Sequence, residues 1–299
     1  MLQFVPVFVG ATFLIFAMVF AIPGDPIRAL SGDKPMPPQV QQQIREEYNL
    51  DDPLVVQYGK YLGGLVRGDF GQDFRGREVT TIMGERIPVT VRLAVLAFVI
   101  ELVIGIAAGV AAGIRGGGFL DYLVKFSTIA VISIPVFVLG FVAQIAFGVR
   151  LGWFPVAGIR DGWFSYLLPA FVLAAISLAY IARLTRTQMM ENLGADYVRT
   201  ATAKGLSRIR VVGIHTLRTS LIPVITFLGA DLGQLMGGAI ITETIFNLPG
   251  IGKAVYDATL AQENTVVVGI VTFLVLVFMI SNLLVDVLYA VLDPRIRYE

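Results

Sequence analysis

Cysteine is absent from this sequence of 299 residues, and histidine occurs only once. Without cysteine the chain can hold no disulfide, no thiolate metal site and no cysteine nucleophile. The single histidine, His215, cannot supply the paired axial ligands that a membrane haem subunit requires. We therefore expect no metal site and no cofactor bound by this chain, and a membrane redox subunit is disfavoured.

Charged residues are also scarce, at 15% of the chain against about 25% in an average soluble domain. Hydrophobic residues make up 56%, and the mean hydropathy is +0.76. Such a chain cannot cover itself with polar surface, so a lipid bilayer is its expected solvent. The net charge of +1 gives no reason to expect a nucleic-acid partner.

Long apolar stretches recur along the chain, each close to the ~20 residues that one bilayer crossing requires. They predict an all-α, polytopic membrane protein with about six transmembrane helices. The predicted helices lie near residues 4–22, 89–113, 122–148, 164–182, 220–241 and 265–290. A cleaved signal peptide is the alternative for the first, but no basic segment or cleavage site precedes Pro23, so a retained helix is favoured.

The chain divides accordingly into a first transmembrane helix (1–23), a polar loop region with one helical stretch near 39–48 (24–88), a five-helix core (89–290) and a tail (291–299). Within the core, residues 183–219 carry seven basic and two acidic residues. Because cytoplasmic loops are enriched in Lys and Arg, we expect this elbow in the cytoplasm. An even number of spans then places both termini there and the 24–88 loop outside the cell (plasma or inner) membrane.

Small residues and prolines within the predicted spans indicate how the helices pack. Glycines at four-residue spacing form one face in the second span and another in the fifth, although glycine is also common in membrane helices generally. We expect prolines to bend the third and fifth spans, since proline removes a backbone donor. These residues are Gly105, Gly109 and Gly113, then Gly229, Gly233 and Gly237, and finally Pro135 and Pro223.

The basic elbow contains a short segment with signals for both helix ends. Asp196 can accept hydrogen bonds from the first-turn amides, Lys204 suits the negative end, and Gly205 can adopt the left-handed conformation that stops a helix. Ser207 can then cap a second helix. Two readings stay open: a rigid two-helix unit that docks on a cytosolic partner, or an amphipathic linker on the membrane surface.

Polar side chains inside spans are candidates for a translocation path, because a charge at the bilayer centre costs about 2.5 to 3.5 kcal/mol. Asp231 and Gln234 are three residues apart and so share a helix face, which we favour for the path. Interhelical hydrogen bonding is the alternative for each. Asp231 has no evident acidic partner at similar depth, which argues against an intramembrane protease. The candidates are Glu101, Gln144, Asp231, Gln234 and Asn282, with a structural role preferred for Asp286.

Several recognisable segments are spread over essentially the whole chain. They are Pro23-Gly24-Asp25-Pro26, Gly68-Asp69-Phe70-Gly71, Arg86-Ile87-Pro88-Val89-Thr90, Ile134-Pro135-Val136-Phe137, residues 196–206 and 238–252, and Asp286 through Asp293-Pro294-Arg295-Ile296-Arg297. In their order and spacing these segments resemble the dipeptide/oligopeptide permeases of ABC importers, and a chance match of all of them is very improbable. The elbow segment departs from the general permease consensus, having Arg199 where Glu is usual, as in the peptide subgroup.

This resemblance implies a type I ABC importer permease fold and a non-enzymatic role as the first membrane subunit of a permease pair. The implied partners are a homologous second permease subunit, two cytosolic ATPase subunits and an external substrate-binding protein. ATP and magnesium would be used by the ATPases, since Gly250-Ile251-Gly252-Lys253 lacks the residues of a phosphate loop.

The resemblance also assigns residues. Those expected to couple to an ATPase are Asp196, Tyr197, Val198, Arg199, Thr200, Ala201, Ala203, Lys204, Gly205 and Leu206. An outer gate or a docking site for the binding protein is expected at Glu243, Phe246, Asn247, Pro249 and Gly250. Short peptides are the expected cargo, with nickel, glutathione or another small solute, or a passive channel, as alternatives.

Overall fold

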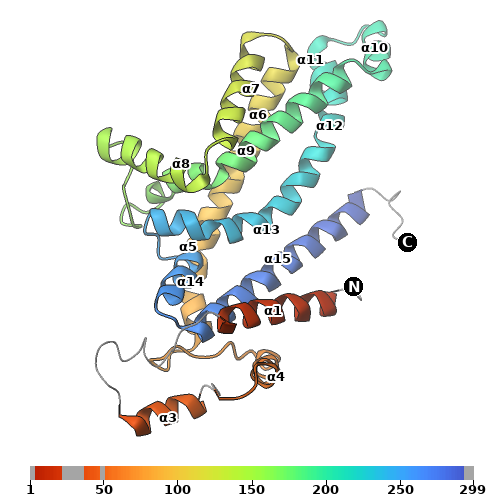
Figure 1. Ribbon diagram of the computed structural model, residues 1–299. Coiled ribbons are helices and arrows are strands. Elements are labelled where there is room, and N and C mark those ends of the chain that lie inside the picture. Colours follow the sequence, from red (N-terminus) through yellow and green to blue (C-terminus); the bar gives the residue numbers. More distant parts are fainter. Residues whose placement is uncertain (1–3, 22–36, 48–50, 293–299) are drawn as a thin grey trace. The chain divides into compact units, whose positions relative to one another are not determined.

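The computed structural model describes residues 4–21, 37–47 and 51–292 (Figure 1). The Pro23-Gly24-Asp25-Pro26 motif and the tail from residue 293 lie outside the described residues. Throughout the described part the regular structure is helical, apart from an isolated bridge between Gln72 and Glu78. The predicted all-α class is confirmed.

The chain divides into two compact units, each with contributions from separate stretches of sequence. The first unit combines Met1–Thr90 with Pro249–Met279. It contains α1 (Phe4–Ala21), α3 (Pro38–Glu47), α4 (Leu54–Leu65), the start of α5 (Val79–Ile100), α14 (Ile251–Leu260) and the start of α15 (Asn264–Leu292).

Within the described residues of the first unit, two apolar clusters hold the helices together. Val79 on α5, Ile251 on α14 and Ile270 on α15 are fully buried in one of them. In the other, Phe16 of α1 packs against Tyr58 of α4, whose hydroxyl lies 2.8 Å from Thr12 Oγ1. The polar α4 region is thereby attached to the apolar α1.

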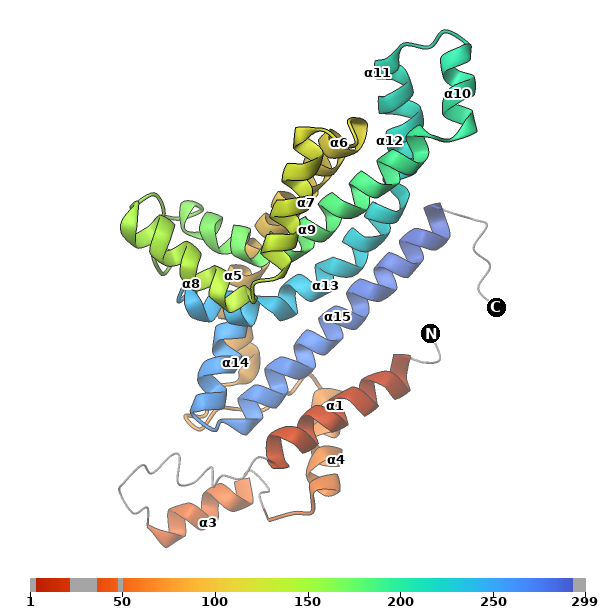
Figure 2. The ribbon, with the colours of Figure 1, turned by 45° about the horizontal axis from the view of Figure 1, so that its top comes forward.

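The second unit combines Val91–Leu248 with Ile280–Glu299. After the end of α5 come η1 (Glu101–Gly105), α6 (Ile106–Ile114), α7 (Phe119–Ile132), α8 (Val136–Ala143), η2 (Gln144–Arg150), α9 (Phe164–Leu193), α10 (Asp196–Ala203), α11 (Arg208–Arg210), η3 (Val211–Thr216), α12 (Leu217–Ser220) and α13 (Ile222–Ile245). Here η denotes a π-helical turn, a rare geometry that is frequent at functional sites. Figures 1 and 2 show α6, α7 and α9 side by side within this unit.

The apolar helices match the predicted spans in position but not in shape. Among the described residues, three helices are long and apolar enough to cross a membrane: Val79–Ile114, Phe164–Leu193 and Asn264–Leu284. Two further candidates are bent pairs, Phe119–Ile132 with Val136–Arg150 at 105° and Arg208–Ser220 with Ile222–Gly237 at 46°. The shorter apolar helix Phe4–Phe20 corresponds to the first predicted span.

Proline explains the sharper of the two bends. Pro135 stands just before α8 as its N-cap residue, in an extended conformation that ends α7. Pro223 occupies the first turn of α13, where no intrahelical donor is required, and the bend lies just before it. The predicted bends in the third and fifth spans are confirmed.

Several predicted boundaries were wrong. Helix α5 begins at Val79 and runs through Pro88, well before the expected start at Val89. Helix α9 continues to Leu193, past the expected end at Ala182, so the elbow begins only at Gly194. Helices α4 and α14 were not predicted at all.

The first glycine face packs directly against α9. A Cβ atom added at Gly105 would lie 2.8 Å from Ile181 Cγ2, and one at Gly113 would lie 2.6 Å from Met189 Cβ. At Gly109 it would lie 2.5 Å from Thr185 Cβ and 2.6 Å from the Ala182 carbonyl oxygen. The predicted close approach is confirmed for this face. In the second set, a Cβ at Gly237 would meet nothing within 4 Å.

We expect Gly109→Ala to lower the stability of the membrane protein by about 1–3 kcal/mol, because the added methyl group is blocked by the α9 backbone. The matched control is Gly84→Ala in α5, where a Cβ would meet nothing within 4 Å and alanine favours the helix. The midpoint of thermal unfolding in detergent measures both. Equal midpoints for the two variants would show that the α6–α9 contact is looser than described.

Candidate functional site

Helix α10 and the turn after it form a compact elbow at one end of α9 and α12 (Figures 1 and 2). Gly205 ends the elbow helix with φ +81°, the left-handed conformation that glycine adopts without strain. Val198, Ala201 and Val211 are buried against one another, with Leu206 packed beside them. The elbow therefore has its own small core and is not a loose linker.

The expected cap at the start of the elbow was wrong. The N-cap residue of α10 is Ala195, and it makes no side-chain capping bond. Asp196 is the first helical residue, where its charge still favours the positive end of the helix. Its carboxylate lies 3.6 Å from Arg199 Nη1, and both side chains are exposed, so this pair adds little stability. Ser207 is the N-cap residue of α11, also without a side-chain bond.

The elbow separates the predicted coupling residues into two groups. Val198 and Ala201 are buried and Leu206 is half-buried, so these three shape the elbow from within. The remainder are exposed and form its outer surface: Asp196, Tyr197, Arg199, Thr200, Ala203, Lys204 and Gly205. A partner protein would meet this second group.

A hydrogen-bond network attaches α10 to the two helices that frame it. Tyr197 Oη donates to Asn192 Oδ1 at 2.8 Å. Asn192 Nδ2 in turn donates to the Gln188 carbonyl oxygen at 2.8 Å and to Ser220 Oγ at 3.1 Å. Ser220 is fully buried and donates to the Thr216 carbonyl oxygen at 2.8 Å. The network joins α10, α9 and α12, and sequence reasoning missed it because its bond between Asn192 and Ser220 joins positions 28 apart in the chain.

Within the span region, Glu101 and Asp231 are brought together. Glu101 begins η1 and is fully buried, Asp231 on α13 is 2% exposed, and an electrostatic interaction links the two carboxyl groups. Ser177 Oγ on α9 donates to Asp231 Oδ1 at 2.8 Å. The expectation that Asp231 has no acidic partner was wrong. Each acid stands at the middle of its predicted span, so their equal depth was readable from the sequence.

Gln144, another path candidate, begins the π-helical turn η2. Its Nε2 donates to the carbonyl oxygens of Val156 at 2.8 Å and Ile245 at 3.0 Å. Both donor positions of the amide are thereby used, and Gln144 connects η2 to the end of α13.

The remaining path candidates differ in exposure. Gln234 is exposed on α13 although Asp231, three residues before it, is buried. Asn282 is half-buried on α15. The side chain of Asp286 lies outside the described residues.

The gate candidates belong to two different units. In the second unit, Glu243 and Phe246 are buried, and Asn247 is exposed with φ +48° where the chain turns after α13. In the first unit, Gly250 is the buried N-cap residue of α14 and Pro249 is half-buried. The chain turns in this segment, between the end of α13 and the start of α14.

No group of three His, Cys, Asp or Glu side chains gathers as a metal ion would require, among the residues that the structure describes. The arrangement instead offers a rigid exposed elbow, a buried acid pair and a bundle of apolar helices.

The sequence matches two families, which together cover nearly the whole chain. Residues 102–298 match the family "Binding-protein-dependent transport system inner membrane component". Residues 2–94 match "Binding-prot-dependent transport system membrane comp, N-term". The chain belongs to the family of binding-protein-dependent transport-system inner membrane components.

Individual relatives are similar to this chain over nearly their full lengths. A putative peptide transport system permease protein of Brucella abortus is 40% identical, over 99% of this chain and 97% of the relative. The di/tripeptide transport system permease protein DppB of Pseudomonas aeruginosa is 38% identical, over 99% of this chain and 96% of the relative. The dipeptide transport system permease protein DppB of Escherichia coli K12 is 36% identical over the same shares.

A solved structure supports the fold. A chain of the inward-facing MetNI methionine ABC transporter superposes with a TM-score of 0.58, covering 71% of this chain and 96% of that chain at 17% identity. The protein is thus a multi-pass membrane permease subunit with the fold of ABC importer permeases, it is not itself an enzyme, and it works with other subunits of a transport system.

We expect Glu101→Gln to leave stability unchanged or raise it, because the amide keeps the shape of the buried side chain and cannot become negatively charged beside Asp231. Glu101→Ala should lower stability by about 2 kcal/mol or more, since it leaves a cavity. Thermal unfolding midpoints of the two variants provide the comparison, with the exposed Glu191→Gln and Glu191→Ala as controls. A Gln variant as unstable as the Ala variant would mean that the Glu101 charge itself is required.

Proposed function

We propose that this chain is a membrane-spanning permease subunit of an ATP-driven importer that moves short peptides into the cytoplasm by alternating access. The observation that carries the proposal is the exposed α10 elbow, which has its own core and is bonded to α9 and α12. A stiff connection of this kind can transmit force, whereas a passive channel has no use for it. Peptide cargo is supported by the names of the relatives.

The proposed assembly contains a homologous second permease subunit, two cytosolic ATPase subunits and an external substrate-binding protein. The exposed residues of the elbow would fit a cleft on one ATPase, with Val198 and Ala201 keeping their backbone in place. ATP and magnesium would bind the ATPases. Closure of the ATPases on ATP would open the permease pair outward, and hydrolysis would return it inward.

The proposed setting is the cell (plasma or inner) membrane, with both termini in the cytoplasm. This orientation is supported by the basic residues of 183–219, several of which lie on the C-terminal part of α9 and on the elbow. The proposed organisation keeps a first span within 1–23, an external region at 24–88, a core at 89–290 and a cytoplasmic tail at 291–299. The coupling elbow is shortened to the part that follows Leu193.

For the translocation path we propose Gln234 and Asn282, which are not fully buried within the subunit. Asp231 and Gln144 would support the path through hydrogen bonds between helices, and Glu101 would support it as a buried group beside Asp231. Asn247 and the turn around it, with Glu243, Phe246, Pro249 and Gly250, would form the outer gate or the contact with the binding protein.

Gly205→Pro provides the test of coupling. Proline fixes φ near −65° and cannot adopt the +81° of Gly205, so the elbow must change shape. In the assembled complex in proteoliposomes, we expect dipeptide uptake and peptide-stimulated ATPase activity to fall by roughly tenfold or more, as a strain of about 1.4 kcal/mol or more would cause.

The matched control is Gly152→Pro, which disturbs a glycine with φ +63° in a loop after η2, outside the elbow. It should retain uptake. Unaltered uptake and unaltered stimulated ATPase activity in Gly205→Pro would contradict the coupling role. Uptake of nickel or glutathione in place of dipeptides by the unaltered complex would contradict the cargo.

A further inference from the structure

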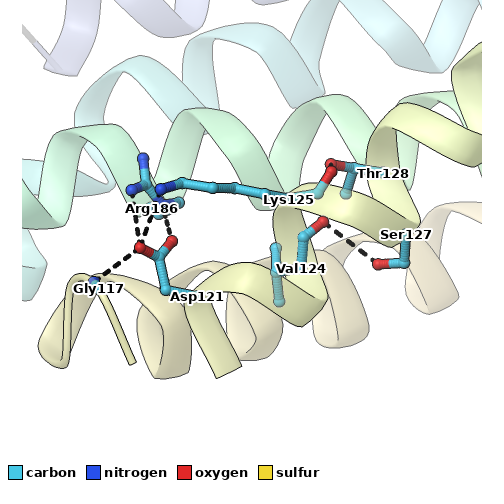
Figure 3. Close-up of polar contacts among 7 residues, drawn as sticks. All are labelled: Gly117, Asp121, Val124, Lys125, Ser127, Thr128 and Arg186. Atoms are coloured by element: carbon cyan, nitrogen blue, oxygen red, sulfur yellow. Dashed lines mark hydrogen bonds and ion pairs between the residues drawn. The ribbon is translucent and has the colours of Figure 1, made fainter. Parts of the chain in front are cut away.

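Asp121 is a fully buried carboxylate at the start of α7, and it gathers partners from three places (Figure 3). Its Oδ2 accepts hydrogen bonds from the Gly117 amide at 2.8 Å and from Arg186 Nη2 at 3.1 Å. Its Oδ1 is bound by Arg186 Nε, and Lys125 Nζ lies 3.0 Å from Oδ2. The two-point contact with Arg186 fixes both distance and orientation, as bidentate arginine–carboxylate pairs do.

This cluster joins the turn between α6 and α7 to α9. Gly117 lies in that turn, with φ +81°. Arg186 lies on α9 next to Thr185, whose Cβ packs against Gly109. The ion pair therefore continues the glycine contact of α6 and α9 to the end of the hairpin.

Helix α7 packs along α6 and α9, and among the described residues its ion pair to α9 lies at its start. At its far end the chain breaks at Ser133–Pro135 and α8 leaves at 105°. A helix with a break at one end can swing unless its other end is fixed. The Asp121–Arg186 pair supplies that fixed end.

On α9, the same pair stands close to the elbow. Asn192, which bonds both Tyr197 of α10 and Ser220 of α12, is six residues after Arg186, or about 9 Å along the helix. One stretch of α9 thus carries the elbow network and the α7 contact within two turns.

We propose that Asp121 and Arg186 are positioning residues that make the α6–α7 hairpin move with α9 and α10 as one body. A displacement of α10 by its partner then reaches the membrane bundle through this hairpin as well as through α9 and α12. The inference rests on the proposed function for its driving force, but the rigid connection is a property of this chain.

The first experiment measures rigidity directly in the assembled complex. The chain has no native cysteine, so spin labels attached through Phe119→Cys on α7 and Thr200→Cys on α10 report one distance. Both positions are exposed. With the pair intact, we expect the same narrow distance distribution in the nucleotide-free and ATP-trapped complex. With Asp121→Asn added, we expect it to broaden and to differ between the two states.

The second experiment measures transport. Asp121→Asn and Arg186→Gln should reduce the number of dipeptides taken up per ATP hydrolysed by about fivefold or more, the scale of a lost coupling interaction. Arg186→Lys keeps the charge without the fork and should lie between Arg186→Gln and the native chain. Arg183→Gln, an exposed arginine one turn earlier on α9, should leave the ratio unchanged.

The outcomes of these experiments separate the proposed role of the Asp121–Arg186 pair from the proposed function of the chain. The variants could lower the amount of assembled complex, the dipeptide uptake and the ATPase activity all by the same factor. In that case the pair has only a structural role and the proposal is overturned. The proposal is also overturned if the Asp121→Asn complex shows the native distance distribution in both nucleotide states. This result counts even if Asp121→Asn assembles poorly or the cargo proves not to be a peptide. Absence of peptide uptake by the native complex would count against the proposed function alone.

Discussion

Three glycines on one face of η1 and α6 let backbone meet backbone along α9. In lipid, apolar side chains gain nothing by leaving their solvent, so close packing and internal hydrogen bonds must hold the helices together. The contacts at Gly105, Gly109 and Gly113 provide this packing over more than two turns. They make α9 and α6 one rigid element, and the rest of the second unit is arranged along it.

Helix α9 connects the apolar helices of the second unit to the elbow. Its apolar part receives the glycine face and, through Ser177, contacts the Asp231 carboxylate. Its polar part carries Arg186 and then Asn192, which hold α7 and α10 in turn. These contacts use three kinds of interaction, namely packing, hydrogen bonds and a buried ion pair. Together these contacts allow a displacement at one end of α9 to move the groups that are packed at its other end.

Much of the fold could be predicted from the sequence, because the constraints of a lipid environment determine which residue types occur in each segment. The apolar segments, the bend at Pro135, the glycine face of α6 and the left-handed Gly205 all follow from local rules. The family resemblance was carried by motifs such as Gly68-Asp69-Phe70-Gly71 and the elbow segment, and the family match supports it.

What could not be predicted depends on contacts between distant residues. Asp121 and Arg186 are 65 positions apart, and no local pattern pairs them. Equal depth does not say which helix face carries Glu101, so depth alone would not have placed that acid against Asp231. Helix α4 contains three glycines among its 12 residues and α14 has only 10 residues, so both segments read as loops. The capping error at Asp196 was a shift of one residue, within the usual uncertainty of helix ends.

In the working transporter, we expect an ATPase subunit to cover the exposed surface of α10. Because the native chain lacks cysteine, a photoactivatable cross-linker attached through Thr200→Cys reports on that surface alone. In the assembled complex we expect it to capture an ATPase subunit, whereas the same probe at Asp161→Cys, in the loop before α9, should not. An α10 probe that captures only lipid or nothing, in a complex that still transports, would contradict the account.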